Sequence, residues 1–128
     1  MKWLDLDDLE LIHMQIIDAS GGSQGTRDRG RLESALAGMR QEVYGEELYK
    51  TIFEKAAVLL RGIIADHPFV DGNKRTGVMS ALIFLNYNGY ETNKLKDKNL
   101  EDFAVKVAVE HLEIHTIAQW LKACSKKI

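Results

Sequence analysis

Residues 48–88 read LYKTIFEKAAVLLRGIIADHPFVDGNKRTGVMSALIFLNYN, and this stretch decides the fold. In its first part, apolar residues recur every three or four positions, which predicts an amphipathic helix from about Leu48 to Asp66. That helix should end at His67-Pro68, because the residue before a proline avoids the helical region. A second helix is predicted from about Gly72 to Asn88, and its body is apolar on nearly all sides. Such a helix is typical of the buried centre of a domain.

Four further helices are predicted on either side of this pair. Aspartates that can cap a helix and apolar residues at helical spacing place them at about residues 5–19, 28–38, 99–110 and 113–125. A glycine-rich loop at 20–25 separates the first two, and residues 40–46 form a connection or a short hairpin with a turn at Gly45. The expected fold class is all-α, a compact bundle of about six helices.

The composition limits the classes of function. A length of 128 residues suggests one domain, 1–128, and 45% hydrophobic residues with a single proline favour a packed core. A net charge of -2 gives no bulk attraction to nucleic acid or to an anionic membrane. Cys124 is the single cysteine, which fits a reducing compartment. With no signal-peptide pattern and no run of membrane-spanning length, we expect a soluble cytoplasmic protein.

The loop between the two central helices carries the residues suited to chemistry. The imidazole of His67 titrates near neutrality, so it can accept a proton from a hydroxyl nucleophile. Phe69 is apolar within a polar loop and should anchor it in the core. The carboxylate of Asp71 is a hard oxygen ligand that could hold Mg²⁺ against phosphates.

The residues that open the second central helix suit an anion. Free N–H groups in the first turn of a helix bind phosphate, and Gly72 permits the unusual torsions that such a nest needs. Lys74 and Arg75 add full charges there, although two cations oppose the helix dipole at about 0.3–1 kcal/mol each. This conflict is expected where function overrides stability. The alternative is a plain capped loop with solvated Lys and Arg side chains and a histidine bonded to a backbone carbonyl.

These residues resemble a known motif. His67-Pro-Phe-Val-Asp-Gly-Asn-Lys-Arg-Thr76 is similar to the Fic motif His-Pro-Phe-x-Asp/Glu-Gly-Asn-Gly/Lys-Arg-x-x-Arg, and closer to its form in the death-on-curing (Doc) toxins. Residues 25–36, 54–57 and 84–89 also match family segments, so the resemblance covers most of the chain. It implies a Fic/Doc helical domain with a central buried helix and a short flap. The family places this flap at about Arg40 to Tyr49 for docking the target by strand pairing, and the alternative for this region is an ordinary loop.

The resemblance also implies a reaction on ATP. Fic proteins typically transfer AMP to a hydroxyl, whereas Doc toxins transfer the γ-phosphate to a threonine of elongation factor Tu and stop translation. Two departures favour the Doc chemistry. Lys74 stands where AMP-transferring members have glycine, and the second Fic arginine falls at the apolar Val78. Losing that arginine allows a nucleotide orientation that presents the γ-phosphate.

Roles follow by resemblance for the residues that match the motif. His67 would be the general base, Asp71 would hold Mg²⁺, and Arg75 would stabilise the transferring group. Contacts to phosphate or ATP would come from Gly72, Asn73, Lys74 and Arg75. The family's self-inhibitory segment has no match here. The expected partner besides the protein target is therefore a small antitoxin whose disordered tail folds on this domain.

Several alternatives remain open. The chain could be a Fic-type AMP or nucleotidyl transferase, or a catalytically silent module that binds an antitoxin. Direct binding of nucleic acid is disfavoured, since no basic stripe is visible. We expect Arg27 and Asp28 to form an ion pair with a helix cap. The histidines His13, His111 and His115 should be surface or packing residues, with no metal-ligand spacing to the cysteine.

Overall fold

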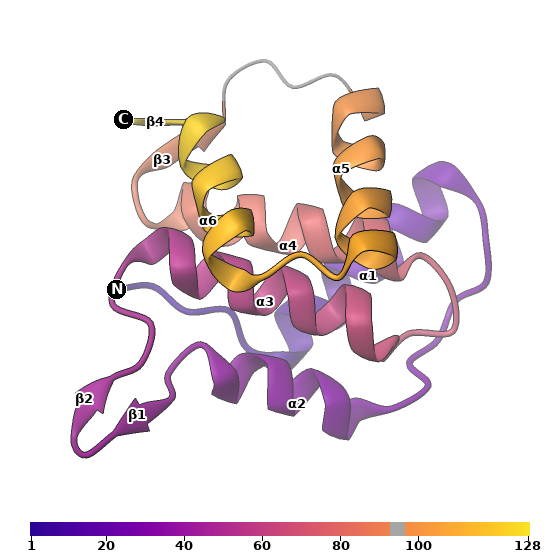
Figure 1. The fold of residues 1–128 in the computed structure, drawn as a ribbon. Helices are drawn as coiled ribbons and strands as arrows, with labels where there is room; N and C mark the ends of the chain where they lie inside the picture. The colour runs from indigo at the N-terminus through magenta and orange to yellow at the C-terminus, as the bar shows by residue number, and fades with distance from the viewer. Residues whose placement is uncertain (93–96) are drawn as a thin grey trace.

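The computed structural model describes residues 1–92 and 97–128, and in this part of the chain it confirms the all-α bundle (Figure 1). The elements are α1 (Leu6–Ser20), α2 (Arg29–Gly38), β1 (Glu42–Val43), β2 (Glu46–Glu47), α3 (Ile52–Asp66), α4 (Asn73–Tyr87), β3 (Tyr90–Thr92), α5 (Asp97–Glu110), α6 (Ile114–Ala123) and β4 (Ser125–Lys127). None of the helices in these two ranges combines the length and the hydrophobicity needed to cross a bilayer.

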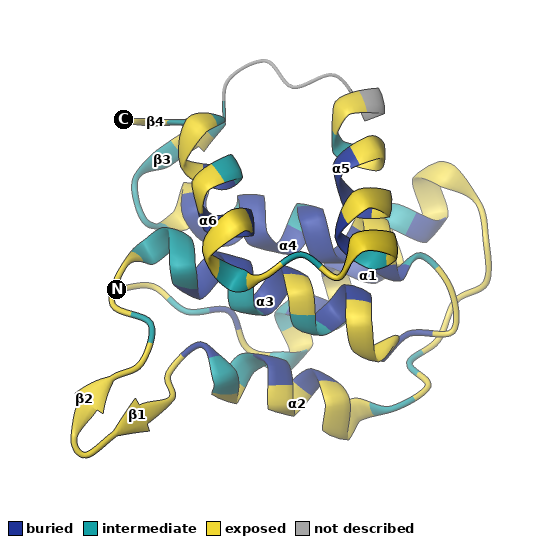
Figure 2. Ribbon diagram, viewed as in Figure 1, coloured by how far each residue is buried: buried dark blue, intermediate teal, exposed yellow. Residues whose placement is uncertain are grey.

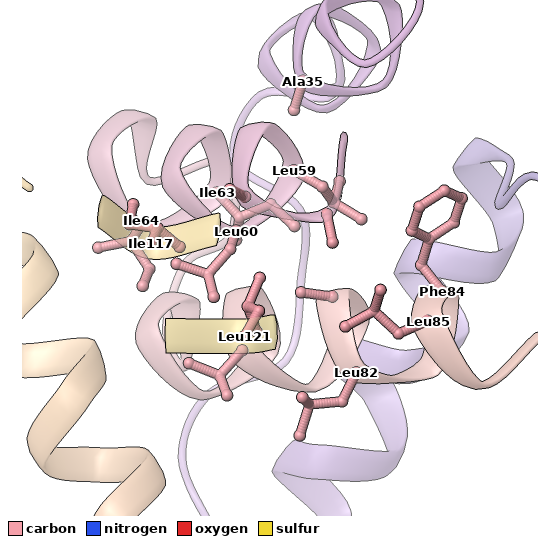
Figure 3. Close-up of a cluster of buried hydrophobic side chains, with 14 of the residues drawn as sticks. Ala35, Leu59, Leu60, Ile63, Ile64, Leu82, Phe84, Leu85, Ile117 and Leu121 are labelled. Atoms are coloured by element: carbon pink, nitrogen blue, oxygen red, sulfur yellow. The ribbon is translucent and has the colours of Figure 1, made fainter. Parts of the chain in front are cut away.

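Helix α4 lies at the centre, as its apolar sequence predicted. It packs against α1, α3 and α5, while α3 in turn contacts α2 and α6. Buried residues therefore line both α3 and α4, whereas the outer faces of α1, α2 and α5 are exposed (Figure 2). Leucines and isoleucines of α3, α4 and α6 form the middle of the core, with Phe84 at one end (Figure 3). A Cβ at Gly77 would lie 3.0 Å from Cγ1 of Ile64, so this glycine permits the close approach of α4 to α3.

Three helix starts are set by side-chain caps, and α1 begins after a capping box formed by Asp5 and Asp8. The side chain of Asp28 accepts a bond from the backbone N–H of Arg31, which confirms the predicted cap of α2. Helix α3 begins at Ile52, four residues after the predicted start at Leu48. The reason is a capping box, in which Thr51 and Glu54 each accept a bond from the other's backbone N–H.

A small sheet at the end of the chain was not predicted. Strand β3 pairs antiparallel with β4, with Tyr90 opposite Lys127 and Thr92 opposite Ser125. Because β4 begins at Ser125, helix α6 ends at Ala123, two residues before its predicted end. Three-residue strands carry too little alternation to be seen in a sequence.

The short hairpin predicted near Gly45 is present but lies far from the loop that begins at His67. Strands β1 and β2 pair through a turn in which Tyr44 and Gly45 have φ angles of 52° and 79°. The hairpin precedes the start of α3, whereas His67 follows its end (Figure 1). A helix of 15 residues separates the two by about 22 Å. The hairpin at residues 40–49 therefore does not lie beside the His67 loop, and its role as a flap that docks the target stays a prediction.

Candidate active site

The end of α3 holds His67 in an unusual conformation. His67 is the C-cap residue, with φ 49° and ψ 56° in the left-handed region, which costs a residue with a side chain about 1–2 kcal/mol. Two arginines satisfy the carbonyls at this helix end: Arg27 donates to the oxygen of His67 and Arg31 to that of Asp66, each at 2.6 Å. Positive charge at a helix C-terminus is also favourable. The His67 side chain is thus presented, exposed, from a fixed backbone.

The segment that lies beside the loop is the stretch between α1 and α2. The backbone N–H groups of Arg27 and Asp28 donate to the carbonyl of Pro68 at 2.8 and 2.9 Å, and Val70 donates to the carbonyl of Gly25 at 3.0 Å. These bonds form strand-like pairing between the loop and the segment that precedes α2. The predicted ion pair between Arg27 and Asp28 is wrong, because Asp28 pairs instead with the helical arginine three residues later, at 3.3 Å.

This segment is itself tied to α1. Thr26 forms an isolated bridge with Phe69, and its hydroxyl donates to a carboxylate oxygen of Glu10 at 2.6 Å. That bond, together with the nearby guanidinium of Arg29, holds the pKa of Glu10 below its ordinary value, against a smaller opposing effect of burial. Sequence reasoning missed this pairing, although the glycine-rich run at 21–25 was a signal of an irregular segment.

Two side chains fix the shape of the loop, one by burial and the other by hydrogen bonds to the loop backbone. Phe69 is 1% exposed, which confirms that it anchors the loop in the core. The amide of Asn73 bonds twice to the backbone of Phe69, accepting from its N–H at 2.9 Å and donating to its carbonyl at 3.0 Å. The Asn73 side chain therefore shapes the loop, and its predicted contact to phosphate would come from the backbone N–H.

The N-terminus of α4 is open to an anion. Gly72 is the N-cap residue in the left-handed region, with φ 75° and ψ 20°, and no described side chain caps this helix. A helix start without a side-chain cap leaves several N–H groups without an intrahelical partner. Lys74 and Arg75 are exposed beside it. An uncapped helix start beside two exposed cations is the geometry that the predicted anion nest requires, and phosphate binding there stays a prediction.

The carboxylate of Asp71 lies next to this nest. One oxygen accepts from the N–H of Gly72 at 2.8 Å and the other from the N–H of Ser23 at 3.1 Å. Each oxygen keeps a lone pair, and the residue is exposed, so the donor chemistry fits Mg²⁺. No group of three or more His, Cys, Asp or Glu residues in the described ranges could hold a metal by itself. Any Mg²⁺ here would therefore be shared with bound phosphates.

Arg75 of α4 makes an ion pair with Glu101 of α5. Its guanidinium lies 2.5 Å from a carboxylate oxygen of Glu101 on α5, and the two side chains are 46% and 55% exposed. Exposed pairs of this kind contribute about 0–1 kcal/mol, so a phosphate could replace the glutamate at small cost.

These groups line one cavity of about 920 Å³. Its polar side comes from the loop and the start of α4, and includes His67, Asp71 and Arg75. Its apolar side comes from α1, α4 and α5, and consists of Ile16, Ile17, Val78, Met79, Leu100, Ala104 and Val105. The hairpin contributes no residue to this lining. All six predicted site residues, from His67 through Arg75, do line it.

Comparison with known proteins agrees with this arrangement. A profile described as the Fic/DOC family matches residues 3–85. A relative named Toxin Doc from Mycolicibacterium smegmatis is 38% identical over 101 residues, which are 78% of each chain. One named Protein kinase doc, from Escherichia phage P1, is 31% identical over 122 residues, which cover 95% of this chain and 94% of the relative. The chain therefore belongs to the Fic/DOC family.

Proposed function

We propose that this protein is a Doc-like toxin that transfers the γ-phosphate of ATP to a serine or threonine hydroxyl of a protein target. The observation that carries the proposal is the uncapped N-terminus of α4, which opens with two exposed cations into the cavity that His67 and Asp71 also line. A helix start of this kind binds phosphate, and an ATP-sized molecule suits such a volume.

Two residues favour transfer of the γ-phosphate over transfer of AMP. Val78 is 2% exposed and lines the apolar side of the cavity, at the position of the second Fic arginine. Lys74 is exposed at the first turn of α4, where the AMP-transferring members have glycine. A cavity with one side apolar and its charges gathered at one end supports a nucleotide whose phosphates point toward α4.

The reaction would proceed from His67. Its imidazole would accept the proton of the target hydroxyl as that oxygen attacks the γ-phosphorus. The new O–P bond forms while the bond from the γ-phosphorus to the β–γ bridging oxygen breaks, and ADP leaves with the electron pair. The guanidinium of Arg75 would move from Glu101 to the transferring group, whose oxygens carry the developing charge.

The remaining groups would hold the nucleotide. Backbone N–H groups from Asn73 through Arg75, with the side chain of Lys74, would bind phosphate, while the N–H of Gly72 holds the carboxylate of Asp71. Asp71 would hold Mg²⁺, which when bound would neutralise charge on the phosphates. The relatives named Toxin Doc and Protein kinase doc support the toxin assignment and the transfer of phosphate. By the same resemblance, the target would be elongation factor Tu and the restraint a small antitoxin whose tail folds on this domain.

Labelled ATP tests the proposal. Incubation of the protein with a bacterial lysate and ATP labelled at the γ-position should label a protein band, whereas label at the α-position should not. Transfer of the α-label would instead establish the AMP transferase, and no transfer of either label would favour the silent antitoxin-binding module.

A matched pair of variants assigns the reaction to this site. His67→Ala should reduce labelling by about 10²–10⁴-fold, since that is the usual effect of losing a general base. His111→Ala is the control, because His111 is also exposed and also has a left-handed backbone, with φ 50° against 49° for His67. Equal labelling by the two variants would contradict the role of His67.

A further inference from the structure

A second histidine contacts the His67 loop from the buried side. His13 lies on α1 and is 2% exposed, although the proposed reaction does not use it. Its Nε2 lies 2.7 Å from the carbonyl oxygen of Asp71. A carbonyl can only accept a hydrogen bond, so Nε2 must carry the proton and donate it.

The same ring packs face to face on the loop's buried anchor. The ring centroids of His13 and Phe69 are 3.9 Å apart and the planes differ by 2°. One side chain of α1 therefore contacts the loop at two points, two residues apart. Gly72 also lies close to α1, since a Cβ on it would lie 2.9 Å from Cδ1 of Ile17 and 3.8 Å from Nε2 of His13.

These contacts bear on the orientation of Asp71. Its carboxylate accepts hydrogen bonds from the N–H groups of Gly72 and Ser23, while its backbone carbonyl accepts one from the buried His13. Without the histidine bond, the peptide unit joining Asp71 to Gly72 could rotate. That peptide unit carries the Gly72 N–H, which both orients the carboxylate and precedes the first turn of α4.

We propose that His13 is a positioning residue, which sets the peptide between Asp71 and Gly72 so that the carboxylate and the helix N-terminus face the same phosphates. This inference rests on the proposed function, since it requires a nucleotide with Mg²⁺ at the site. Groups that orient a metal ligand typically change metal affinity or activity by about 10–100-fold when lost.

Two substitutions separate the hydrogen bond from the stacking. His13→Phe keeps a flat ring against Phe69 but has no donor. His13→Gln can place an amide N–H near the position of Nε2 but loses the ring. His115→Phe is the control, because His115 is an exposed histidine on another helix, α6.

The decisive measurement is calorimetric titration with a non-hydrolysable ATP analogue at a series of Mg²⁺ concentrations, with thermal unfolding of each variant alongside. We expect His13→Phe to stay folded and to raise the Mg²⁺ concentration for half-maximal nucleotide binding by about 10–100-fold. His13→Gln should remain within a few-fold of the wild type, even if it melts earlier. His115→Phe should be unchanged.

Three results would overturn the inference. The first is wild-type Mg²⁺ dependence in His13→Phe. The second is an equal rise of the half-maximal Mg²⁺ concentration in the Phe and Gln variants, which would assign the effect to packing. If His13→Phe fails to fold, a large rise in His13→Gln alone would also assign the effect to packing. The third, absence of Mg²⁺-dependent nucleotide binding by the wild type itself, would also refute the proposed function and is thereby distinguished from the other two.

Discussion

Substitution of Gly22 by alanine should damage the Asp71 carboxylate site without unfolding the protein. A Cβ at position 22 would lie 2.6 Å from Oδ2 of Asp71, 3.2 Å from Cδ1 of Ile17 and 3.4 Å from Cγ of Asp71. The nearest atom belongs to the end of a flexible side chain, so the carboxylate would rotate away. In doing so it would lose the 3.1 Å bond from the N–H of Ser23.

The neighbouring glycine provides the control. Gly21 and Gly22 have φ angles of 83° and 116°, so alanine at either position is strained by about 1–3 kcal/mol. A Cβ on Gly21 would meet nothing within 4 Å. Since domains are stable by about 5–15 kcal/mol, both variants should fold. Only Gly22→Ala should displace the carboxylate.

The two variants should therefore differ in Mg²⁺ dependence and not in stability. Phosphate transfer measured over a range of Mg²⁺ concentrations should show a half-maximal point about 10–100-fold higher in Gly22→Ala than in Gly21→Ala. Urea unfolding should give similar free energies for both. If the two variants show the same Mg²⁺ dependence, Asp71 does not hold the ion.

Four further changes test other parts of the site and fold. Arg75→Ala should lower transfer far more than it lowers the free energy of unfolding, because the guanidinium opposes the α4 dipole; unfolding of this variant would show a structural role. Glu101→Gln should tighten ATP binding by up to about five-fold in calorimetry, since it removes a competitor worth about 0–1 kcal/mol; weaker binding would contradict the displacement of this pair. Gly77→Ala should cost about 1–3 kcal/mol in urea unfolding through its contact with Ile64, and an unchanged stability would refute the tight helix crossing. The lowered pKa of Glu10 stabilises the fold above that group's ordinary value of 4.5 and loses this effect as pH falls through the folded value. The stability difference between the wild type and Glu10→Gln, measured by urea unfolding, should therefore shrink on acidification, and a constant difference would contradict it.

Much of the fold could be predicted from the sequence because it depends on long, periodic segments. The apolar body of α4 marked it as the central helix, and the proline after His67 placed the end of α3. The predicted cap at Asp28 was confirmed for the same reason, since a cap is a local bond. The start of α3 was wrong because Leu48 and Tyr49 extend the apolar pattern beyond the Thr51 cap.

The parts of the site that could not be predicted depend on contacts between distant segments. The hydrogen bonds that join Gly25 to Val70 and His13 to Asp71 leave no periodic signal. The six predicted site residues could be found because they lie within one ten-residue motif. Sequence order also does not show how far α3 separates the hairpin from His67.

The proposed transfer of one phosphoryl group by His67 and the N-terminus of α4 can be tested most directly by measuring the intact mass of a target. Purified elongation factor Tu, the target that the resemblance implies, would be incubated with Mg²⁺, ATP and either the wild type or His67→Ala. We predict a mass increase equal to one phosphoryl group with the wild type and none with the variant. An increase equal to one AMP, or a phosphoryl gain that persists in His67→Ala, would contradict this assignment.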